Sequence, residues 1–126
     1  MEDSRFGYEN LEVWQKAIDW VTRVIAFTDT LQTDRKHYRL MEQLEASCCA
    51  VPINIAEGKG RFSRREYLQF LYIARGSLYE AMTLLELFLR QGWIQSDQFH
   101  TLKREARVIA RQLNALIRSI RRSLSP

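Results

Sequence analysis

Two short patterns in this sequence pair an aspartate with a histidine three residues later. Asp34 precedes His37, and Asp97 precedes His100. Residues three apart share one face of a helix, and bundles that bind two metal ions use Glu-x-x-His on two of their helices. The pairs therefore suggest a carboxylate-bridged metal centre as the sharpest enzymatic hypothesis.

Three features weigh against this hypothesis. The acidic residues are aspartates, they stand where helices are predicted to begin, and aspartate is common there as a cap. The carboxylates that would complete the centre, Asp29 and Glu86, are predicted near helix ends, far from a bundle interior. No catalytic triad order, Cys-His pair, phosphate-binding glycine loop or zinc spacing appears elsewhere. We expect a protein with no metal, no cofactor and no enzymatic activity.

The only cysteines are the neighbours Cys48 and Cys49. Adjacent cysteines cannot readily bond to each other, so they are interpreted as small buried hydrophobic residues in a reducing compartment. Neither a charged-then-apolar leader nor an apolar run of the ~20 residues that span a bilayer is present. We expect a cytoplasmic protein without a membrane partner.

Arginines near the C-terminus carry the clearest functional signal. The chain has a net charge of +4, but residues 95–126 hold seven basic and two acidic side chains, a net charge of +5. At roughly 100° per residue, five arginines fall within an arc of about 60° on one helix, away from its apolar stripe: Arg104, Arg107, Arg111, Arg118 and Arg122. A single-sign arc of arginines fits a phosphate backbone, either RNA or DNA. A solvated face that keeps a small protein soluble is the alternative.

A second basic cluster follows the predicted second helix. Arg61, Arg64 and Arg65 stand close to Lys59. Helix N-termini bind anions by themselves, so this cluster is a less specific signal than the arc.

The elements that position these residues are helices. A chain of 126 residues with only 5 Gly and 2 Pro has the length of one domain and too little turn material for a many-stranded β fold. Periodicity predicts helices over residues 11–31, 35–57, 64–91 and 97–122, and short connections favour antiparallel neighbours. We therefore expect an all-α fold, a single up-down-up-down four-helix bundle. In its first helix the apolar face is predicted to comprise Leu11, Trp14, Ile18, Val21 and Ile25.

Local signals define the helix ends. Asn10 is expected to cap the first helix, and Ser96 or Asp97 the fourth. Gly58 is expected to end the second in a left-handed conformation, and Gly92 the third.

A capping box is predicted where the third helix begins. Ser63 and Glu66 have its spacing, and Phe62 and Tyr67 occupy the hydrophobic-staple positions on either side.

Two helix interiors break local rules. Pro52 removes a backbone hydrogen bond within the second helix, so we expect a kink there. Gly76 costs about 1 kcal/mol in the third helix, and an absent side chain suggests that another backbone, that of the second helix, approaches closely. Asn54 and Glu57 are expected to secure the end of the second helix by hydrogen bonds to its neighbours, although a functional role is the alternative.

The segments "YENLEVWQKA" and "MEQLEASCCAVPINIAEGKGRFSRREYLQFLYIARGSLYE" resemble the bacterial 23S ribosomal RNA intervening-sequence proteins, or S23 family. The resemblance implies a four-helix bundle, a pentamer in some members, and a distant relation to nucleic-acid-binding accessory proteins of diversity-generating retroelements. One departure is the "LQTDRKHY" loop, which replaces the family's usual Phe-Pro turn. The resemblance implies structural or interface roles for the residues of the family motif, which are Pro52, Asn54, Glu57, Gly58, Gly76, Ser77 and Glu80.

Apolar residues of the third helix extend beyond the one face that a bundle buries. Self-association would cover the apolar residues of the third helix that the bundle leaves exposed, and the resemblance implies a pentamer. A ring of copies would also repeat the arginine arc. Trp20, Phe27 and Tyr72 are expected in the core, with an interface as the alternative. The sequence thus favours a non-enzymatic homo-oligomer that binds RNA or DNA, and the rival hypothesis is a scaffold that binds another polypeptide through apolar surface.

Overall fold

Four long helices make up most of the computed structural model, which describes residues 4–31 and 35–125. A 3₁₀ turn, η1 (Gly7–Asn10), precedes them. The helices are α1 (Glu12–Asp29), α2 (Arg35–Lys59), α3 (Arg64–Arg90) and α4 (Ser96–Leu124). Each begins and ends within two residues of the bounds predicted from periodicity. The all-α prediction is confirmed.

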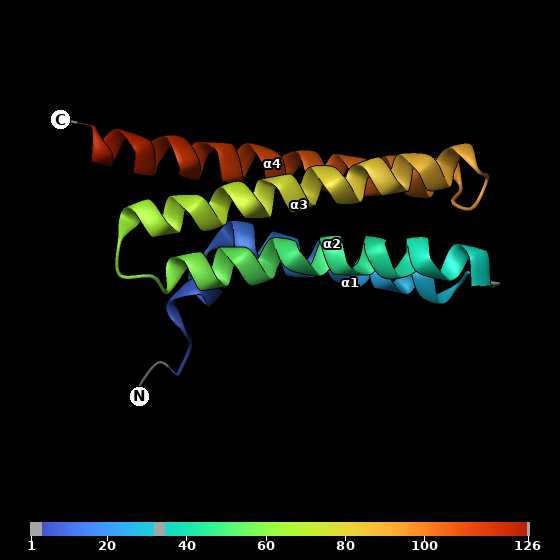
Figure 1. Cartoon of the computed structure of the whole chain (residues 1–126), viewed down its shortest axis with the longest axis horizontal. Helices are drawn as coiled ribbons and strands as arrows, with labels where there is room; N and C mark the ends of the chain where they lie inside the picture. The colour runs from blue at the N-terminus through green and yellow to red at the C-terminus, as the bar shows by residue number, and fades with distance from the viewer. Residues whose placement is uncertain (1–3, 32–34, 126) are drawn as a thin grey trace.

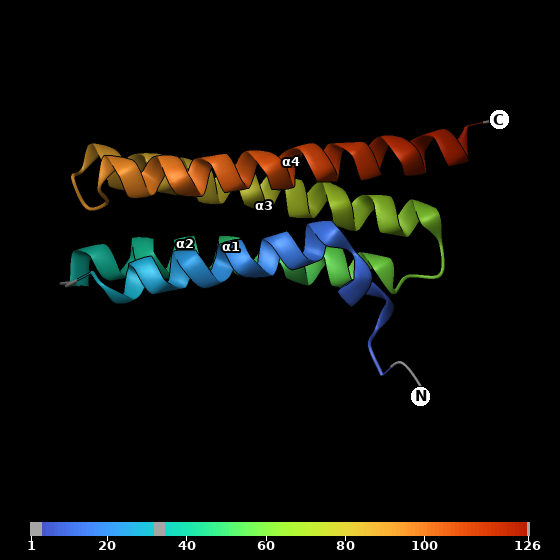
Figure 2. The same cartoon turned by 180° about the vertical axis from the view of Figure 1, so that it is seen from behind.

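The helices pack side by side with their axes roughly parallel (Figures 1 and 2). Each contacts its neighbours in the chain, and α4 also contacts α1. The start of α3 meets the end of α4, where Arg64 Nε donates to Ser123 Oγ over 2.8 Å. The two helices therefore run antiparallel, and the α2–α3 turn lies at the same end of the bundle as the C-terminus.

The core lies along the bundle axis and is almost entirely apolar. On α2, Leu44, Cys48, Val51 and Ile55 are fully buried, and their spacing of three or four residues places them on one face of the helix. Trp20 is also fully buried, and its indole N–H donates to the Leu102 carbonyl over 3.0 Å, which ties α1 to α4. Burial with the polar group paired is the arrangement that stabilises a core tryptophan.

The other aromatic residues expected in the core differ in burial. Phe27 is buried and packs against Phe88, with 6.3 Å between ring centroids. Tyr72 is only partly buried at the margin of the core. The core interpretation therefore holds fully for Trp20 and Phe27 and in part for Tyr72.

The predicted apolar face of α1 is wrong for two of its five residues, whereas Val21 is buried and Leu11 and Trp14 pack against the core in part. Ile18 and Ile25 are more than one-third exposed, whereas Val13, Ala17 and Val24 are buried. The buried residues of α1 also alternate in steps of three and four, so periodicity alone cannot choose between the two stripes. The observed face buries the larger aromatic side chains and thus more apolar area.

Gly58 does not cap α2, contrary to prediction. It is buried inside the helix, and the only glycine of the described chain with a positive φ is Gly92, at +76°. A Cβ at Gly58 would lie 2.7 Å from Phe70 Cβ and 3.0 Å from Tyr67 Cδ1. Gly58 is therefore a point of close approach between α2 and α3, and the absent side chain permits the contact.

Gly76 does not mark a close helix contact, and that expectation was also wrong. The residue is exposed, and a Cβ there would meet nothing within 4 Å. The close approach predicted for Gly76 occurs instead at Gly58, against Tyr67 and Phe70 of α3.

The predicted N-caps of α1 and α4 are absent, whereas the predicted glycine at the end of α3 is present. Leu11 rather than Asn10 precedes α1, and Gln95 rather than Ser96 or Asp97 precedes α4; neither side chain makes a capping bond. Gly92 ends α3 as predicted, where the Trp93 N–H reaches the Phe88 carbonyl over 2.9 Å.

At the start of α3, Ser63 Oγ accepts from the Glu66 N–H over 3.1 Å, as expected of the cap. The staple is wrong, because Phe62 is fully exposed while Tyr67 packs against the Gly58 position. Pro52 is buried within a helix that continues for seven more residues, and the kink stays a prediction.

Candidate nucleic-acid interface

The outer face of α4 carries the predicted arginine arc. The buried residues of α4 recur every three or four positions from Phe99 to Ile120, which fixes the side of the helix that faces the core. All five arginines of the arc lie on the opposite side and are exposed. The arc therefore runs along the outer face of α4 from Arg104 to Arg122.

The two basic clusters predicted separately meet at one end of the molecule. The hydrogen bond from Arg64 to Ser123 places the start of α3 against the last turns of α4. A shallow hollow of about 290 Å³ lies on the same last turns of α4, lined by Arg118, Arg121, Arg122 and Ser125. Arg121 lies outside the predicted arc, and only the fold brings these arginines close to Arg64.

Aromatic rings hold two cations of the α2–α3 turn. The Arg61 guanidinium lies 4.5 Å from the centroid of the Phe70 ring, and Lys59 Nζ lies 5.9 Å from that of Tyr67. Cation–π contacts at exposed sites contribute about 0.5–1 kcal/mol and restrict the cation to one region of the surface.

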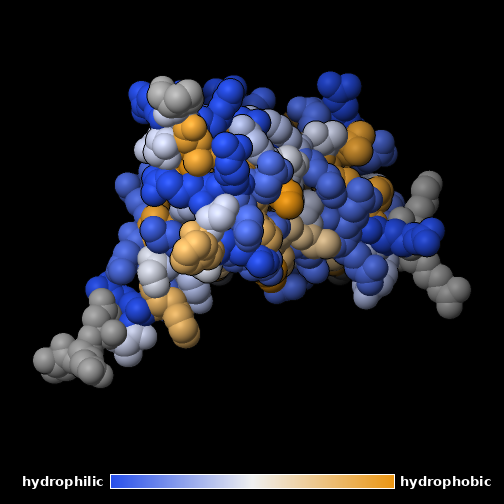
Figure 3. All heavy atoms as spheres, turned by 60° about the vertical axis from the view of Figure 1, so that its left-hand side comes forward, coloured by the Kyte–Doolittle hydropathy of each residue, from blue (hydrophilic) through white to orange (hydrophobic). Residues whose placement is uncertain are grey.

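Arg65 is exposed at the start of α3. A space-filling view toward this end shows mainly hydrophilic side chains with hydrophobic ones in separate spots (Figure 3).

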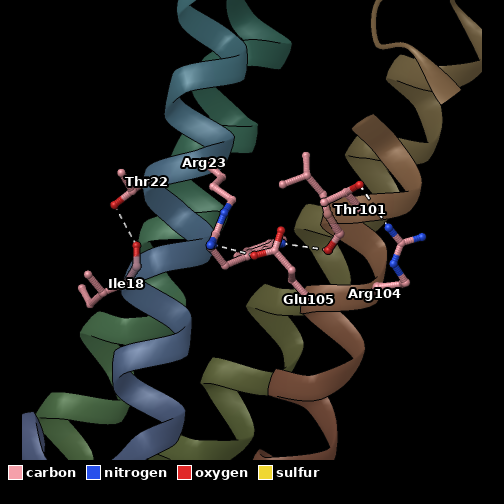
Figure 4. A network of polar contacts seen from close by, with 8 residues as sticks. Ile18, Thr22, Arg23, Thr101, Arg104 and Glu105 are labelled. Atoms are coloured by element: carbon pink, nitrogen blue, oxygen red, sulfur yellow. Dashed lines mark hydrogen bonds and ion pairs between the residues drawn. The ribbon is translucent and has the colours of Figure 1, made fainter. Parts of the chain in front are cut away.

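The side of α4 that faces α1 has a mixed charge. Arg23 Nη1 and Glu105 Oε2 form an ion pair between the two helices (Figure 4). On the outer side of Glu105, Arg104 Nη2 donates to Thr101 Oγ1 over 3.2 Å. Because Asp19 and Glu105 border the hollow at Arg23, that hollow is poorly suited to an anion.

The family-motif residues divide between packing and exposure. The Asn54 side chain donates to the Ala50 carbonyl of its own helix over 2.7 Å, so the expected tie to a neighbouring helix is wrong for Asn54. Glu57 and Glu80 are exposed, and Ser77 is half-buried.

The thiols are poorly suited to nucleophilic chemistry. Burial, the neighbouring Cys49 and Glu45 raise the pKa of Cys48 far above its ordinary value. Burial and then Glu45 also raise the pKa of Cys49. A raised pKa leaves little thiolate at neutral pH, which is typical of structural cysteines.

Tyr67 is a polar group inside the α2–α3 seam. Burial raises its pKa, and Arg64 partly opposes that rise. Its hydroxyl is buried without a hydrogen-bond partner among the described residues. The ring serves packing at Gly58 and the contact with Lys59.

The Asp-His patterns do not assemble a metal site within the described residues. Asp34 lies outside them, and across residues 4–31 and 35–125 no three His, Cys, Asp or Glu side chains are grouped to hold a metal ion. His37 packs against the Trp93 ring, with 4.0 Å between centroids, and His100 against Phe99 at 5.4 Å. In the same ranges, no helix has the length and apolarity needed to cross a bilayer.

The fold and the surface together define a small all-α protein with a basic face along one helix. Residues 9–115 match the family described as 23S rRNA-intervening sequence protein. The chain belongs to this family.

One solved structure illustrates the shared fold. It is described as a protein with unknown function from the S23 ribosomal protein family of Bacteroides thetaiotaomicron, and it superimposes with a TM-score of 0.78. The alignment covers 83% of this chain and 97% of the other at 24% sequence identity. No curated protein matches the chain.

Proposed function

We propose that this protein binds nucleic acid, RNA or a ribonucleoprotein above all, and does so without catalysis. The observation that carries the proposal is that five exposed arginines line the outer face of α4, while the basic α2–α3 turn lies at the same end of the bundle as the last turns of α4. Arginine forms bidentate contacts with phosphate, and a surface of one sign attracts a polyanion over longer range than isolated pairs do. Within the described residues, no three His, Cys, Asp or Glu side chains form a group that could hold a metal ion.

Self-association is the second part of the proposal. Apolar side chains remain in solvent on the outer sides of α2 and α3: Ile53 is 51% exposed, Ile73 52% and Leu87 45%. A second copy of the chain would cover this surface and repeat the arginine arc, so that several weak phosphate contacts combine on one strand. A pentamer is the assembly that the resemblance favours.

The rival function is a scaffold that binds another polypeptide through the same apolar surface. Salt separates the two functions, because phosphate contacts release counterions and weaken steeply as salt rises, whereas apolar contacts do not.

The experiment titrates labelled single-stranded RNA and DNA with the purified protein at 50 and 200 mM salt and measures fluorescence anisotropy. We expect binding that weakens by at least tenfold over this range for three or more phosphate contacts. Absence of binding at 50 mM salt, together with capture of a polypeptide partner that resists salt, would favour the scaffold.

A further inference from the structure

Phe62 is the most exposed large apolar side chain of the described residues. Its relative exposure is 105%, against 66% for Phe6, the next highest. It lies in the α2–α3 turn, directly after Arg61 and two residues before Arg64. A phenylalanine that makes no contribution to the core is unusual in a domain of this size, because large aromatic side chains dominate core packing.

The turn that carries Phe62 is held on both sides by hydrogen bonds. The Gly60 N–H reaches the Ala56 carbonyl over 3.2 Å, and the Arg61 N–H reaches that of Gly58 over 3.1 Å. On the other side, the Ser63 cap accepts from Glu66. Phe62 therefore extends from a fixed backbone.

The neighbouring aromatic side chains are already engaged. Tyr67, its expected staple partner, packs at Gly58, and the Phe70 ring is covered by Arg61. The sequence thus breaks the staple rule at a basic surface, and broken local rules are expected at functional sites.

An exposed aromatic ring among cations is the composition of surfaces that bind single-stranded nucleic acid. There, bases stack on aromatic rings while cationic side chains follow the phosphates. Around Phe62, the cations Lys59, Arg61, Arg64 and Arg65 outnumber the acids Glu57 and Glu66 by four to two. The Arg64–Ser123 hydrogen bond places the turn at the same end of the bundle as the arginine hollow on the last turns of α4.

We propose that Phe62 stacks on an unpaired base of a single-stranded nucleic acid whose phosphates contact the arginines of the turn and of the α4 end. This inference rests on the proposed function and specifies its ligand as single-stranded. A base within a duplex is already stacked on both faces, so duplex binding would not use Phe62.

The test compares wild type with Phe62→Ala, Phe62→Trp and a control, Tyr38→Ala. Tyr38 is an exposed aromatic residue near the start of α2, at the opposite end of the bundle. Each protein is titrated with a labelled 12-nucleotide single strand and with the matching duplex, at several salt concentrations.

We expect Phe62→Ala to bind the single strand about 5- to 100-fold more weakly, since stacking contributes about that factor per base. Its affinity for the duplex, its salt slope and its melting temperature should equal those of wild type, and Phe62→Trp should restore binding. Tyr38→Ala should behave as wild type in every assay.

Equal single-strand affinity for wild type and Phe62→Ala would overturn the inference and leave the proposed function standing. If wild type binds no nucleic acid at all, the proposed function fails first. A smaller particle of Phe62→Ala in light scattering, or loss of binding to anionic vesicles, would assign the ring to self-association or to a lipid surface instead, and would also overturn the inference.

Discussion

The contact at Gly58 permits a sharp test of the α2–α3 packing. In Gly58→Ala the new Cβ would lie 2.7 Å from Phe70 Cβ, which is attached directly to the α3 backbone and cannot rotate away. Overpacking of this kind costs about 1–3 kcal/mol. Alanine also gains up to about 1 kcal/mol of helix propensity over glycine. The net expected change is a loss of about 0–2 kcal/mol.

Gly76→Ala is the matched control, because it makes the same chemical change inside a helix where nothing lies within 4 Å. It should gain about 1 kcal/mol from propensity alone. The difference between the two variants removes the propensity contribution and isolates the clash, about 1–3 kcal/mol. At about 4 °C per kcal/mol, their melting temperatures should differ by roughly 4–12 °C.

Urea and thermal unfolding should be followed by circular dichroism at the lowest protein concentration that gives a signal, where association contributes least. If Gly58→Ala is as stable as Gly76→Ala, the two helices are not in backbone contact at Gly58, and the reasoning is refuted. A loss of stability in Gly76→Ala would show that another surface lies against that residue.

Three further predictions concern the core, the thiol and the assembly. Trp20→Phe should lose about 1–3 kcal/mol of unfolding free energy, because the indole bond to Leu102 and part of the packing disappear; an unchanged urea midpoint would contradict this. Because the folded chain raises the pKa of Cys48 above its ordinary value of 9.0, stability should be complete below pH 9 and fall as pH rises further, and Cys48→Ala should flatten that fall in urea titrations. Light scattering should give a mass well above 14.9 kDa, and Ile73→Gln with Leu87→Gln should lower it; a wild-type monomer at micromolar concentration would exclude self-association through this surface.

Periodicity predicted the bounds of the helices well because apolar residues recur every three or four positions along each of them. On α2 the buried residues from Leu44 to Ile55 are those the spacing selects. On α1 two stripes of similar quality exist, and only the packing of Trp20 and Phe27 against the other helices decides between them. Choosing a face is therefore a tertiary question when a helix is apolar on two sides.

The glycines show why local rules could not place the helix contacts. Gly58 follows an apolar stripe and has the position of an end signal, but it lies within the last turn of α2, where Tyr67 and Phe70 pack against its backbone. Gly76, within a strong helix-forming segment, looks like a contact position and faces open space. A glycine's neighbours come from another helix, and spacing along one helix contains no information about them.

The candidate site was predicted in two parts that the sequence could not join. The arginines of α4 were recognised from their arc, and Arg61, Arg64 and Arg65 from their proximity along the chain. Their junction depends on antiparallel packing of α3 and α4, which brings Arg64 to Ser123 across 59 positions of sequence. Arg121 was not predicted because it lies outside the arc of about 60° on the helical wheel. The structure nevertheless places it in the lining of the same hollow as Arg118 and Arg122.

The slope of log affinity against log salt tests nucleic-acid binding by the arc most directly. Wild type is compared with an arc variant in which Arg104, Arg111 and Arg118 become glutamine. The matched control makes the same change at Lys16, Arg39 and Arg90, which lie on the other three helices, so both variants lose three positive charges. Exposed cations contribute little to folding, so all three proteins should unfold alike. The account predicts that the arc variant loses roughly one unit of slope per lost contact and binds all sequences more weakly, while the control keeps the wild-type slope. An arc variant that binds with wild-type affinity and slope would contradict it.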